Sequence, residues 1–217
     1  IDLDIREGEL LAIAGPNGSG KTTLVRHLNG LERIQRGSIE IFGEELTKEN
    51  KHRLRKNIGL VFQNPDEQIF YPTVYEDVAF GPRNLGLDPK TVEAKVSHAL
   101  KEAQIEHLRD RIAFNMSYGE KKRTAFAGIL AMDPKIIILD EPTIGVDPWA
   151  KPAMFRTIEN FRSHHTVILV THDLSLLKKA ERIALLWNGT LKGVYDNYRA
   201  FYHDAFGHDG TCCTEEL

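Results

Sequence analysis

The sequence predicts an α/β protein with a mainly parallel sheet, and two features predict it. Short apolar runs rich in Leu, Ile and Val recur along the chain, and helical stretches lie between them. Apolar runs without polar alternation are typical of strands that are buried on both faces of a parallel sheet. The predicted strands cover residues 10–14, 136–139, 167–170 and 183–187.

Helix boundaries are marked by Asp and Pro. Asp88-Pro89 opens a helix, because Asp caps the first amide groups and proline suits the first helical position. The apolar residues of this helix recur on one face, as an amphipathic helix requires; they are Val92, Val96, Ala99 and Ala103. Asp147-Pro148 opens a second helix in the same way, Asp173 caps a third, and Asp133-Pro134 ends the helix that follows residues 116–120.

Turns and segment composition indicate the domain organisation. Asn188-Gly189 lies between two β-rich runs and predicts a tight hairpin turn, and so a small antiparallel β part. The polar residues 44–57 predict loop or exposed helix. A helical insertion over about 73–115, with the helix after it, predicts a helical subdomain over about 73–133. With 217 residues, we expect one domain over 1–195 and a short C-terminal tail over 196–217.

Composition argues against several classes of function. The chain is 41% hydrophobic and 27% charged with a net charge of −3, so nothing suggests a nucleic-acid-binding surface. Lys121-Lys122-Arg123 could touch phosphates or form a solvated helix face, and we expect the solvated face. No apolar run approaches the ~18 residues that span a bilayer, and no secretory signal is recognisable. We therefore expect a partner to hold the chain at any membrane.

The two cysteines, Cys212 and Cys213, are adjacent, which gives no disulfide framework and fits a reducing cytosol. With His203 and His208 they could bind a metal. Their spacing matches no standard zinc pattern, so we expect a frayed tail instead.

Residues 15–22 match the phosphate-binding pattern G-x-x-x-x-G-K-[ST] in full. The match follows a predicted strand and opens a helix, which is the context that distinguishes a phosphate loop from a chance glycine-rich turn. We expect Lys21 to bridge the β- and γ-phosphates, Thr22 to ligate Mg²⁺ and Thr23 to reach the α-phosphate. The predicted nucleotide-binding residues here are Gly15, Pro16, Asn17, Gly18, Ser19, Gly20, Lys21, Thr22 and Thr23.

Two carboxylates end the predicted strand at 136–139. Asp140 is placed to hold Mg²⁺, directly or through water, and Glu141 can polarise the water that attacks the γ-phosphate. The alternative is a plain Asp-Glu cap before Pro142, which the upstream phosphate loop disfavours. The two motifs together predict the core of a P-loop nucleotide hydrolase that uses ATP and Mg²⁺.

Ser117-Tyr118-Gly119-Glu120 resembles the LSGGQ signature of ATP-binding-cassette (ABC) ATPases, in a variant that continues into Lys-Lys-Arg. The resemblance implies that Ser117, Gly119 and Glu120 contact the γ-phosphate bound by a second ABC subunit, so that a head-to-tail dimer encloses two ATP molecules. Tyr118 replaces a signature glycine at a position that we expect to tolerate change. Taken alone, the motif could be an ordinary helix N-cap.

Three further residues match elements of the same family. Gln63 resembles the Q-loop glutamine, which would touch Mg²⁺ or the lytic water, and His172 resembles the switch histidine that contacts the γ-phosphate. Asp147 resembles the D-loop residue that crosses the dimer interface. By resemblance, Glu141, His172 and Gln63 are the catalytic residues, and Thr22, Gln63 and Asp140 are the metal-binding residues.

Residues 59–87 and 119–132 resemble the energy-coupling-factor ATPases, which include the cobalt- and nickel-uptake type. This implies a peripheral ATPase at the cytoplasmic face of the cell membrane that drives an integral-membrane scaffold and imports a vitamin or a transition-metal ion. Residues 64–85 would contact the scaffold, and Phe70, Tyr71 and Phe80 either serve that contact or pack in the local core. The substrate, and whether the dimer is homo- or heteromeric, stay open.

The ends of the chain depart from the family pattern. No aromatic residue precedes Gly15 to stack on adenine, and residues 196–217 do not clearly match a C-terminal helical extension, so we expect the start to be missing. Two alternative functions stay open: a nucleotide-gated switch that barely hydrolyses ATP, and an ABC ATPase of DNA maintenance or translation. The pair Glu141 and His172 disfavours the first, and the net charge of −3 disfavours the second.

Overall fold

A six-stranded sheet forms the centre of the computed structural model, which describes residues 1–149, 151–162 and 165–207. The strands run in the order β4-β5-β6-β1-β7-β8, and all pair in parallel except β8, which is antiparallel to β7. Their bounds are β1 Leu10–Ala14, β4 Ile58–Val61, β5 Ile136–Asp140, β6 Thr166–Val170, β7 Arg182–Trp187 and β8 Thr190–Tyr195. The predicted α/β fold with a mainly parallel sheet is confirmed.

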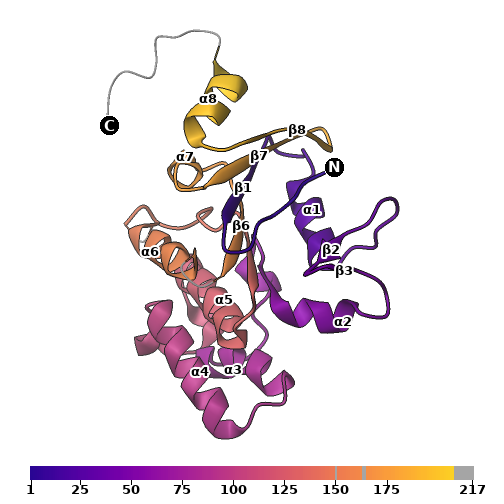
Figure 1. Cartoon of the computed structure of the whole chain (residues 1–217). Helices are drawn as coiled ribbons and strands as arrows, with labels where there is room; N and C mark the ends of the chain where they lie inside the picture. The colour runs from indigo at the N-terminus through magenta and orange to yellow at the C-terminus, as the bar shows by residue number, and fades with distance from the viewer. Residues whose placement is uncertain (150, 163–164, 208–217) are drawn as a thin grey trace.

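Helices cover both faces of this sheet (Figure 1). One face carries α1 (Lys21–Leu28), α2 (Lys51–Leu54) and the small antiparallel pair β2 (Glu40–Ile41) and β3 (Glu44–Glu45). The other face carries α5 (Tyr118–Met132), α6 (Lys151–Arg162) and α7 (Leu174–Leu177). Ile138 packs toward the first layer while Ile137 and Leu139 pack toward the second, which explains the continuous apolar runs.

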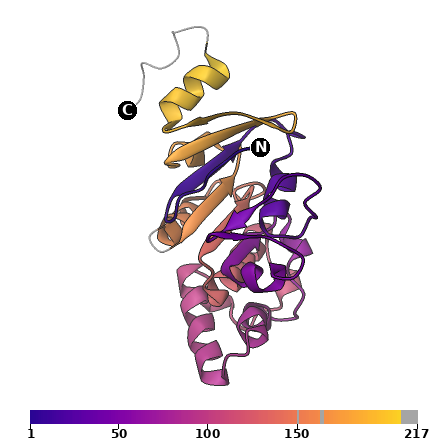
Figure 2. The same cartoon turned by 45° about the vertical axis from the view of Figure 1, so that its right-hand side comes forward.

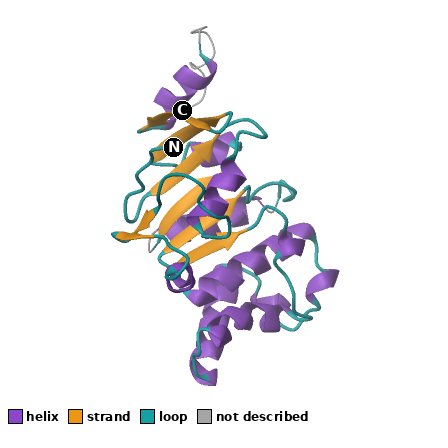
Figure 3. Cartoon of the chain, turned by 90° about the vertical axis from the view of Figure 1, so that its right-hand side faces the viewer, coloured by secondary structure: helices purple, strands orange, loops and turns teal. Residues whose placement is uncertain are grey.

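A helical layer with its own core lies at one end of the molecule (Figures 2 and 3). It consists of α3 (Val74–Asn84), α4 (Pro89–Glu102) and α5. Helix α5 belongs to both cores: Ala125 and Phe126 pack against the sheet, whereas Ala127 and Ala131 pack against the other helices of this layer. Because α5 is shared, its N-terminal turn is held in a fixed position relative to the sheet.

Most of the local signals in the sequence are confirmed. Asn188-Gly189 forms the turn between β7 and β8, with both residues at positive φ. The Asp88 side chain accepts from the amides of Lys90 and Thr91, and that of Asp173 from the amide of Ser175. Asp133 ends α5.

Four expectations about elements need correction or addition. Helix α6 begins at Lys151, later than Asp147-Pro148 indicates, although the Asp147 carboxylate still accepts from the amide of Trp149. The polar residues 44–57 include strand β3 as well as α2, and β4 was not predicted. The segment named as a tail contains α8 (Tyr198–Phe206), which buries Phe201 against the sheet.

Part of the tail lies outside the described residues, including His208, Cys212 and Cys213, so the metal alternative there stays a sequence-based idea. Among the helices of the described ranges, none combines the length and the apolar character that a membrane-spanning helix needs.

Candidate active site

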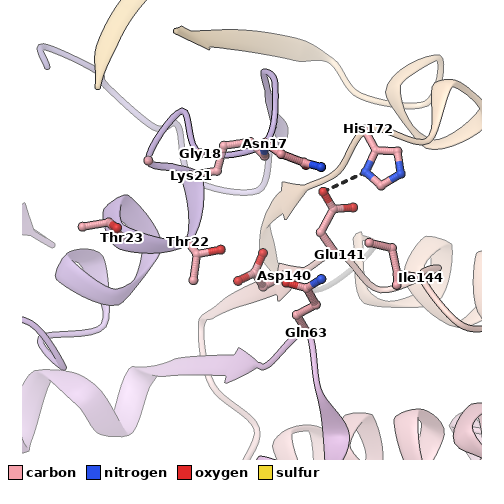
Figure 4. Close-up of a pocket in the computed structure, with 11 residues that line it drawn as sticks. Asn17, Gly18, Lys21, Thr22, Thr23, Gln63, Asp140, Glu141, Ile144 and His172 are labelled. Atoms are coloured by element: carbon pink, nitrogen blue, oxygen red, sulfur yellow. Dashed lines mark hydrogen bonds and ion pairs between the residues drawn. The ribbon is translucent and has the colours of Figure 1, made fainter. Parts of the chain in front are cut away.

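Four neighbouring parallel strands end at one cleft of about 420 Å³ (Figure 4). The loop after β1 supplies the phosphate-binding segment, and β4, β5 and β6 are followed by Gln63, by Asp140 with Glu141, and by His172. Ligands of open α/β sheets bind at the carboxyl ends of the strands, as here. The residues that line the cleft are Asn17, Gly18, Gly20, Lys21, Thr22, Thr23, Gln63, Asp140, Glu141, Ile144 and His172. All but Ile144 were predicted from the sequence.

The phosphate loop ends at a helix whose first amides have no side-chain cap. Gly20 occupies the N-cap position of α1 at φ 97° and offers no side chain to them. Uncapped amides at a helix N-terminus, together with the helix dipole, form a site for an anion. The Ser19 hydroxyl is also buried without a hydrogen-bond partner among the described residues. The loop therefore has free donors for the oxygens of a phosphate group.

Lys21 lies against this loop. Its ammonium donates to the carbonyl oxygens of Gly15 (2.8 Å) and Pro16 (3.0 Å), and the residue is 8% exposed. An ammonium has three N–H groups, so one stays available to a ligand while the other two fix its position. This arrangement places a positive charge at the floor of the cleft.

Gly15 is required by a close approach of two backbones. It adopts φ 150°, and a Cβ atom there would lie 2.0 Å from the carbonyl oxygen of Leu186 in β7. We expect Gly15→Ala to lower the free energy of unfolding by at least about 2 kcal/mol, because the blocking atom is backbone and cannot rotate away. Gly18→Ala is the matched control. Gly18 has a φ of 78°, but nothing lies within 4 Å of the added Cβ atom, so we expect the free energy of unfolding to fall by only about 1 kcal/mol. Urea unfolding measures both, and equal losses would contradict this explanation.

Asp140 is suited to a cation. It is 3% exposed, and its Oδ1 has no hydrogen-bond partner among the described residues. Burial raises the pKa of Asp140, the Thr22 hydroxyl opposes that rise and the charge of Glu141 adds to it. A cation beside Asp140 would satisfy the free oxygen and favour the ionised form. The residues around it fit Mg²⁺, which binds through one or two protein oxygens together with phosphate oxygens and water.

The protein alone does not complete a metal site. Across the described ranges, no group of three or more His, Cys, Asp and Glu residues could hold a metal ion. The predicted set of Thr22, Gln63 and Asp140 lines the cleft; it has a single carboxylate and would need oxygens from the nucleotide to hold Mg²⁺.

Glu141 and His172 form a pair at the mouth of the cleft. His172 Nδ1 lies 3.0 Å from Glu141 Oε1, while Glu141 Oε2 is buried with no hydrogen-bond partner among the described residues (Figure 4). The Glu141 side chain is 7% exposed and that of His172 is 60% exposed. One carboxylate oxygen is thus oriented by the imidazole, and the other is free to accept a proton.

The backbone at Glu141 is unusual and is held by three hydrogen bonds. Its φ is 47°, in the left-handed region that costs a non-glycine residue about 1–2 kcal/mol. Its N–H donates to the Val170 carbonyl (2.8 Å). Its own carbonyl accepts from the ammonium of Lys122 (2.6 Å) and from the N–H of Ile144 (3.3 Å). Strain of this kind persists where the surroundings fix the conformation.

Lys122 corrects the expectation of a solvated helix face at 121–123. It is fully buried, and burial lowers the pKa of Lys122 to about 8, against the opposing charges of Glu141 and Asp140. The spacing along the helix could have indicated this burial. Position 122 lies three and four residues before Ala125 and Phe126, so it shares a helix face with these two buried residues, which pack on the sheet. Lys121 is largely buried too, in a 2.6 Å ion pair with Asp66.

The signature residues do not join the cleft of their own chain. Ser117 caps α5 by accepting from the amide of Glu120, and the Glu120 carboxylate accepts from the amide of Ser117 at 2.8 Å. This capping box is the N-cap alternative left open by the sequence, and it holds the first turn of α5 rigidly. Ser117, Gly119, Glu120 and Asp147 are all missing from the described lining of the cleft.

Tyr118 has specific contacts at the position that we expected to tolerate change. Its hydroxyl donates to the carbonyl of Gln63 (3.0 Å), and a Cβ at Gly145 would lie 2.6 Å from its ring. The ring therefore fills the space between the Gln63 segment and the turn that leads to Asp147. A glycine at position 118 would leave this space empty.

The chain is similar to ABC transporter proteins in sequence. The sequence profile of the ABC transporter family matches residues 1–144. An energy-coupling factor transporter ATP-binding protein of Methanospirillum hungatei is 49% identical over 183 residues, which are 83% of this chain and 66% of that protein. Its counterpart in Methanoculleus marisnigri is 46% identical over 186 residues, 84% of this chain and 67% of that protein. The chain thus spans about two thirds of the length of these two relatives.

Solved structures of ABC proteins are similar to the chain as well. A Clostridium perfringens protein described as part of the ABC transporter complex CbiONQ superposes with a TM-score of 0.85 at 35% identity, covering 94% of this chain and 83% of that one. A dimeric ATP-binding cassette in a post-hydrolysis state with ADP and Pi gives a TM-score of 0.81 at 28% identity, covering 89% of this chain and 88% of that one.

Proposed function

The chain belongs to the ABC transporter family, and from this premise we propose that it hydrolyses ATP to drive uptake through a separate membrane protein. The arrangement of Glu141 carries the proposal. Its carboxylate, oriented by the His172 imidazole, belongs to the same cleft as the phosphate loop and the cation-suited Asp140. A binding module that never hydrolysed ATP would not need an oriented, buried general base at this point.

Nucleotide binding is assigned to the phosphate loop and α1. The amides of residues 15–23 and the Lys21 ammonium would hold the phosphates, with the Ser19 hydroxyl as a further donor. Thr22, Asp140 and Gln63 would hold Mg²⁺ with phosphate oxygens; when bound, the ion neutralises charge that develops on the transferred phosphoryl group. Asp140 supplies the anionic oxygen that this cation needs.

Hydrolysis is assigned to Glu141 and His172. Glu141 Oε2 would accept the proton of the attacking water, and His172 would keep Oε1 in position. The exposed side chain of His172 can also turn toward a γ-phosphate. Gln63, which follows β4, the strand next to β5, would orient the water from the other side of the cleft.

Dimerisation follows from the location of the signature. Ser117, Gly119 and Glu120 lie outside their own cleft, and Ser117 heads a capped helix whose first turn is rigid. These residues would contact the nucleotide of a second cassette, with Asp147 at the interface, so that each catalytic site needs two chains. The second chain is either an identical or a related ABC subunit.

The importer role rests on an aromatic surface in the segment that follows Gln63 along the chain. The Phe70 side chain is 68% exposed. Tyr71 and Phe80 pack against each other with their ring centroids 5.3 Å apart, and both stay exposed. The core-packing alternative therefore does not account for Phe70. Asp77 holds this surface by accepting from the amides of Phe70 and Tyr71. We assign it to an integral-membrane scaffold of the energy-coupling-factor type, at the cytoplasmic face of the membrane, for a vitamin or a metal ion such as cobalt or nickel.

Release of phosphate from ATP tests the function. The chain, purified with its natural partners, is expected to release phosphate in the presence of Mg-ATP, and nucleic acid is expected to leave the rate unchanged. ATP binding without phosphate release would favour a nucleotide-gated switch instead. Stimulation by DNA or RNA would favour a role in DNA maintenance or translation.

The scaffold contact gives a separate prediction. We expect Phe70→Asp to release a tagged chain from the membrane fraction of its native cells while its ATPase rate in detergent-free solution stays unchanged. An aromatic side chain that becomes buried on binding is the kind of residue that dominates such an interface. Phe42→Asp is the control, since Phe42 is 51% exposed but lies beside β2, on another part of the surface. Equal membrane association of both variants would contradict the assignment.

A further inference from the structure

We propose that Lys122 is a positioning residue that holds the catalytic Glu141 in its working conformation from helix α5. The proposal rests on the proposed function, in that Glu141 must be the general base. It begins with one contact, the 2.6 Å hydrogen bond from the Lys122 ammonium to the Glu141 carbonyl. Lys122 is fully buried, and among the described residues this oxygen is the only hydrogen-bond partner of its ammonium.

The conformation of Glu141 explains why such a partner is needed. A φ of 47° turns the Glu141 carbonyl away from the sheet register that β5 follows up to Asp140. The hydrogen bond from a charged donor stabilises this carbonyl, and hydrogen bonds to charged groups contribute more than neutral ones. The same carbonyl accepts a longer hydrogen bond from the N–H of Ile144 (3.3 Å), and the N–H of Glu141 is bonded to Val170, so both backbone groups of the residue are fixed. From this fixed backbone the Glu141 side chain reaches His172, with 3.0 Å between Oε1 and Nδ1.

The surroundings of the ammonium show that the site is built for it. The Tyr118 ring lies 5.6 Å from Lys122 Nζ, an arrangement that favours a cation. Tyr118 in turn donates to the Gln63 carbonyl. One turn of α5 thus contacts both the segment of the proposed water-orienting Gln63 and the backbone of the proposed base.

This link has a consequence for the dimer. Ser117, which we assign to the nucleotide of the partner chain, caps the same helical turn. Because this turn is fixed relative to the sheet, one rigid element holds the Glu141 carbonyl of its own chain and presents Ser117 to the nucleotide of the partner.

The test compares three single variants of the full chain in steady-state ATP hydrolysis. Lys122→Met removes the donor and keeps an unbranched side chain of similar volume; Lys122→Gln has the length of Met but restores an N–H donor. Lys121→Met changes the neighbouring lysine, whose partner is Asp66. We expect Lys122→Met to lower kcat roughly 10- to 100-fold with KM for Mg-ATP within about 2-fold, because misplacement by about 1 Å can cost this much. Lys122→Gln should recover most of the loss, and Lys121→Met should match the wild type.

The outcomes separate this proposal from the function itself. No phosphate release by the wild type would remove the proposed function. If the wild type hydrolyses ATP and the Lys122→Met variant has the same kcat, the positioning role of Lys122 is wrong. If kcat falls equally in Lys122→Met and Lys122→Gln, and the melting temperature falls in parallel, Lys122 serves only to pack the core. Nucleotide binding by each variant, measured with a fluorescent ATP analogue, shows whether the cleft has stayed folded.

Discussion

Replacement of Glu141 by Gln is expected to lower the rate of phosphate release by about 10²- to 10⁴-fold, the range that general-base catalysis contributes. The amide keeps the size of the side chain and can still contact His172, but it cannot accept a proton from water. The phosphate loop, Lys21 and Asp140 are unchanged, so ATP affinity should stay within about 2-fold of wild type. Single-turnover phosphate release and equilibrium nucleotide binding measure the two quantities separately.

A matched control comes from an acidic residue outside the cleft. Glu7 is exposed and is not among the described residues that line the cleft, so Glu7→Gln should behave as wild type in both assays. Full turnover in Glu141→Gln would show that another group is the base.

His172→Ala should give an intermediate loss of the rate of phosphate release, because Glu141 stays in place but loses the imidazole that orients Oε1.

Lys21→Ala is expected to weaken ATP binding by about 100-fold or more. The substitution removes the positive charge from the floor of the cleft, and hydrogen bonds to charged groups contribute about 1.5–3 kcal/mol each. It also leaves the carbonyl oxygens of Gly15 and Pro16 without the donor they have now. The loop would lose its fixed shape as well as its charge. Titration with a fluorescent ATP analogue measures the affinity.

Lys90→Ala provides the comparison, since Lys90 is an exposed lysine at the start of α4. It should leave the affinity unchanged, and circular dichroism should show both variants folded. ATP affinity of Lys21→Ala equal to that of Lys90→Ala would contradict the assignment of the loop.

The sequence revealed the parts of the site that depend on local signals. The phosphate loop has a fixed pattern of glycines and a lysine, and Asp140 and Glu141 end an apolar run, so both could be located without a structure. Parallel strands then bring Gln63, Glu141 and His172 to one edge, as their positions after strands indicate. Their roles stay predictions until variants are measured.

The remaining features depend on contacts between distant segments. Strand β4 has only four residues and includes Gly59, whose missing Cβ lets Ile129 of α5 approach, so its apolar run is too short to stand out. The burial of Lys122 arises because α5 packs on the end of β5, and charge alone gave the opposite expectation. Tyr118 was judged by its departure from a motif, whereas its contacts are with Gln63 and Gly145.

The central claim is that the catalytic cleft is completed by the signature of a second chain. Light scattering of Glu141→Gln with and without Mg-ATP tests it most directly, because this variant should bind ATP and not consume it. The mass of the chain is expected to double on addition of Mg-ATP, and a further Ser117→Arg change should prevent the doubling. If a related cassette is the partner, the doubling requires that chain in the mixture. A mass that stays that of one chain while ATP is bound, with either partner present, would contradict the claim.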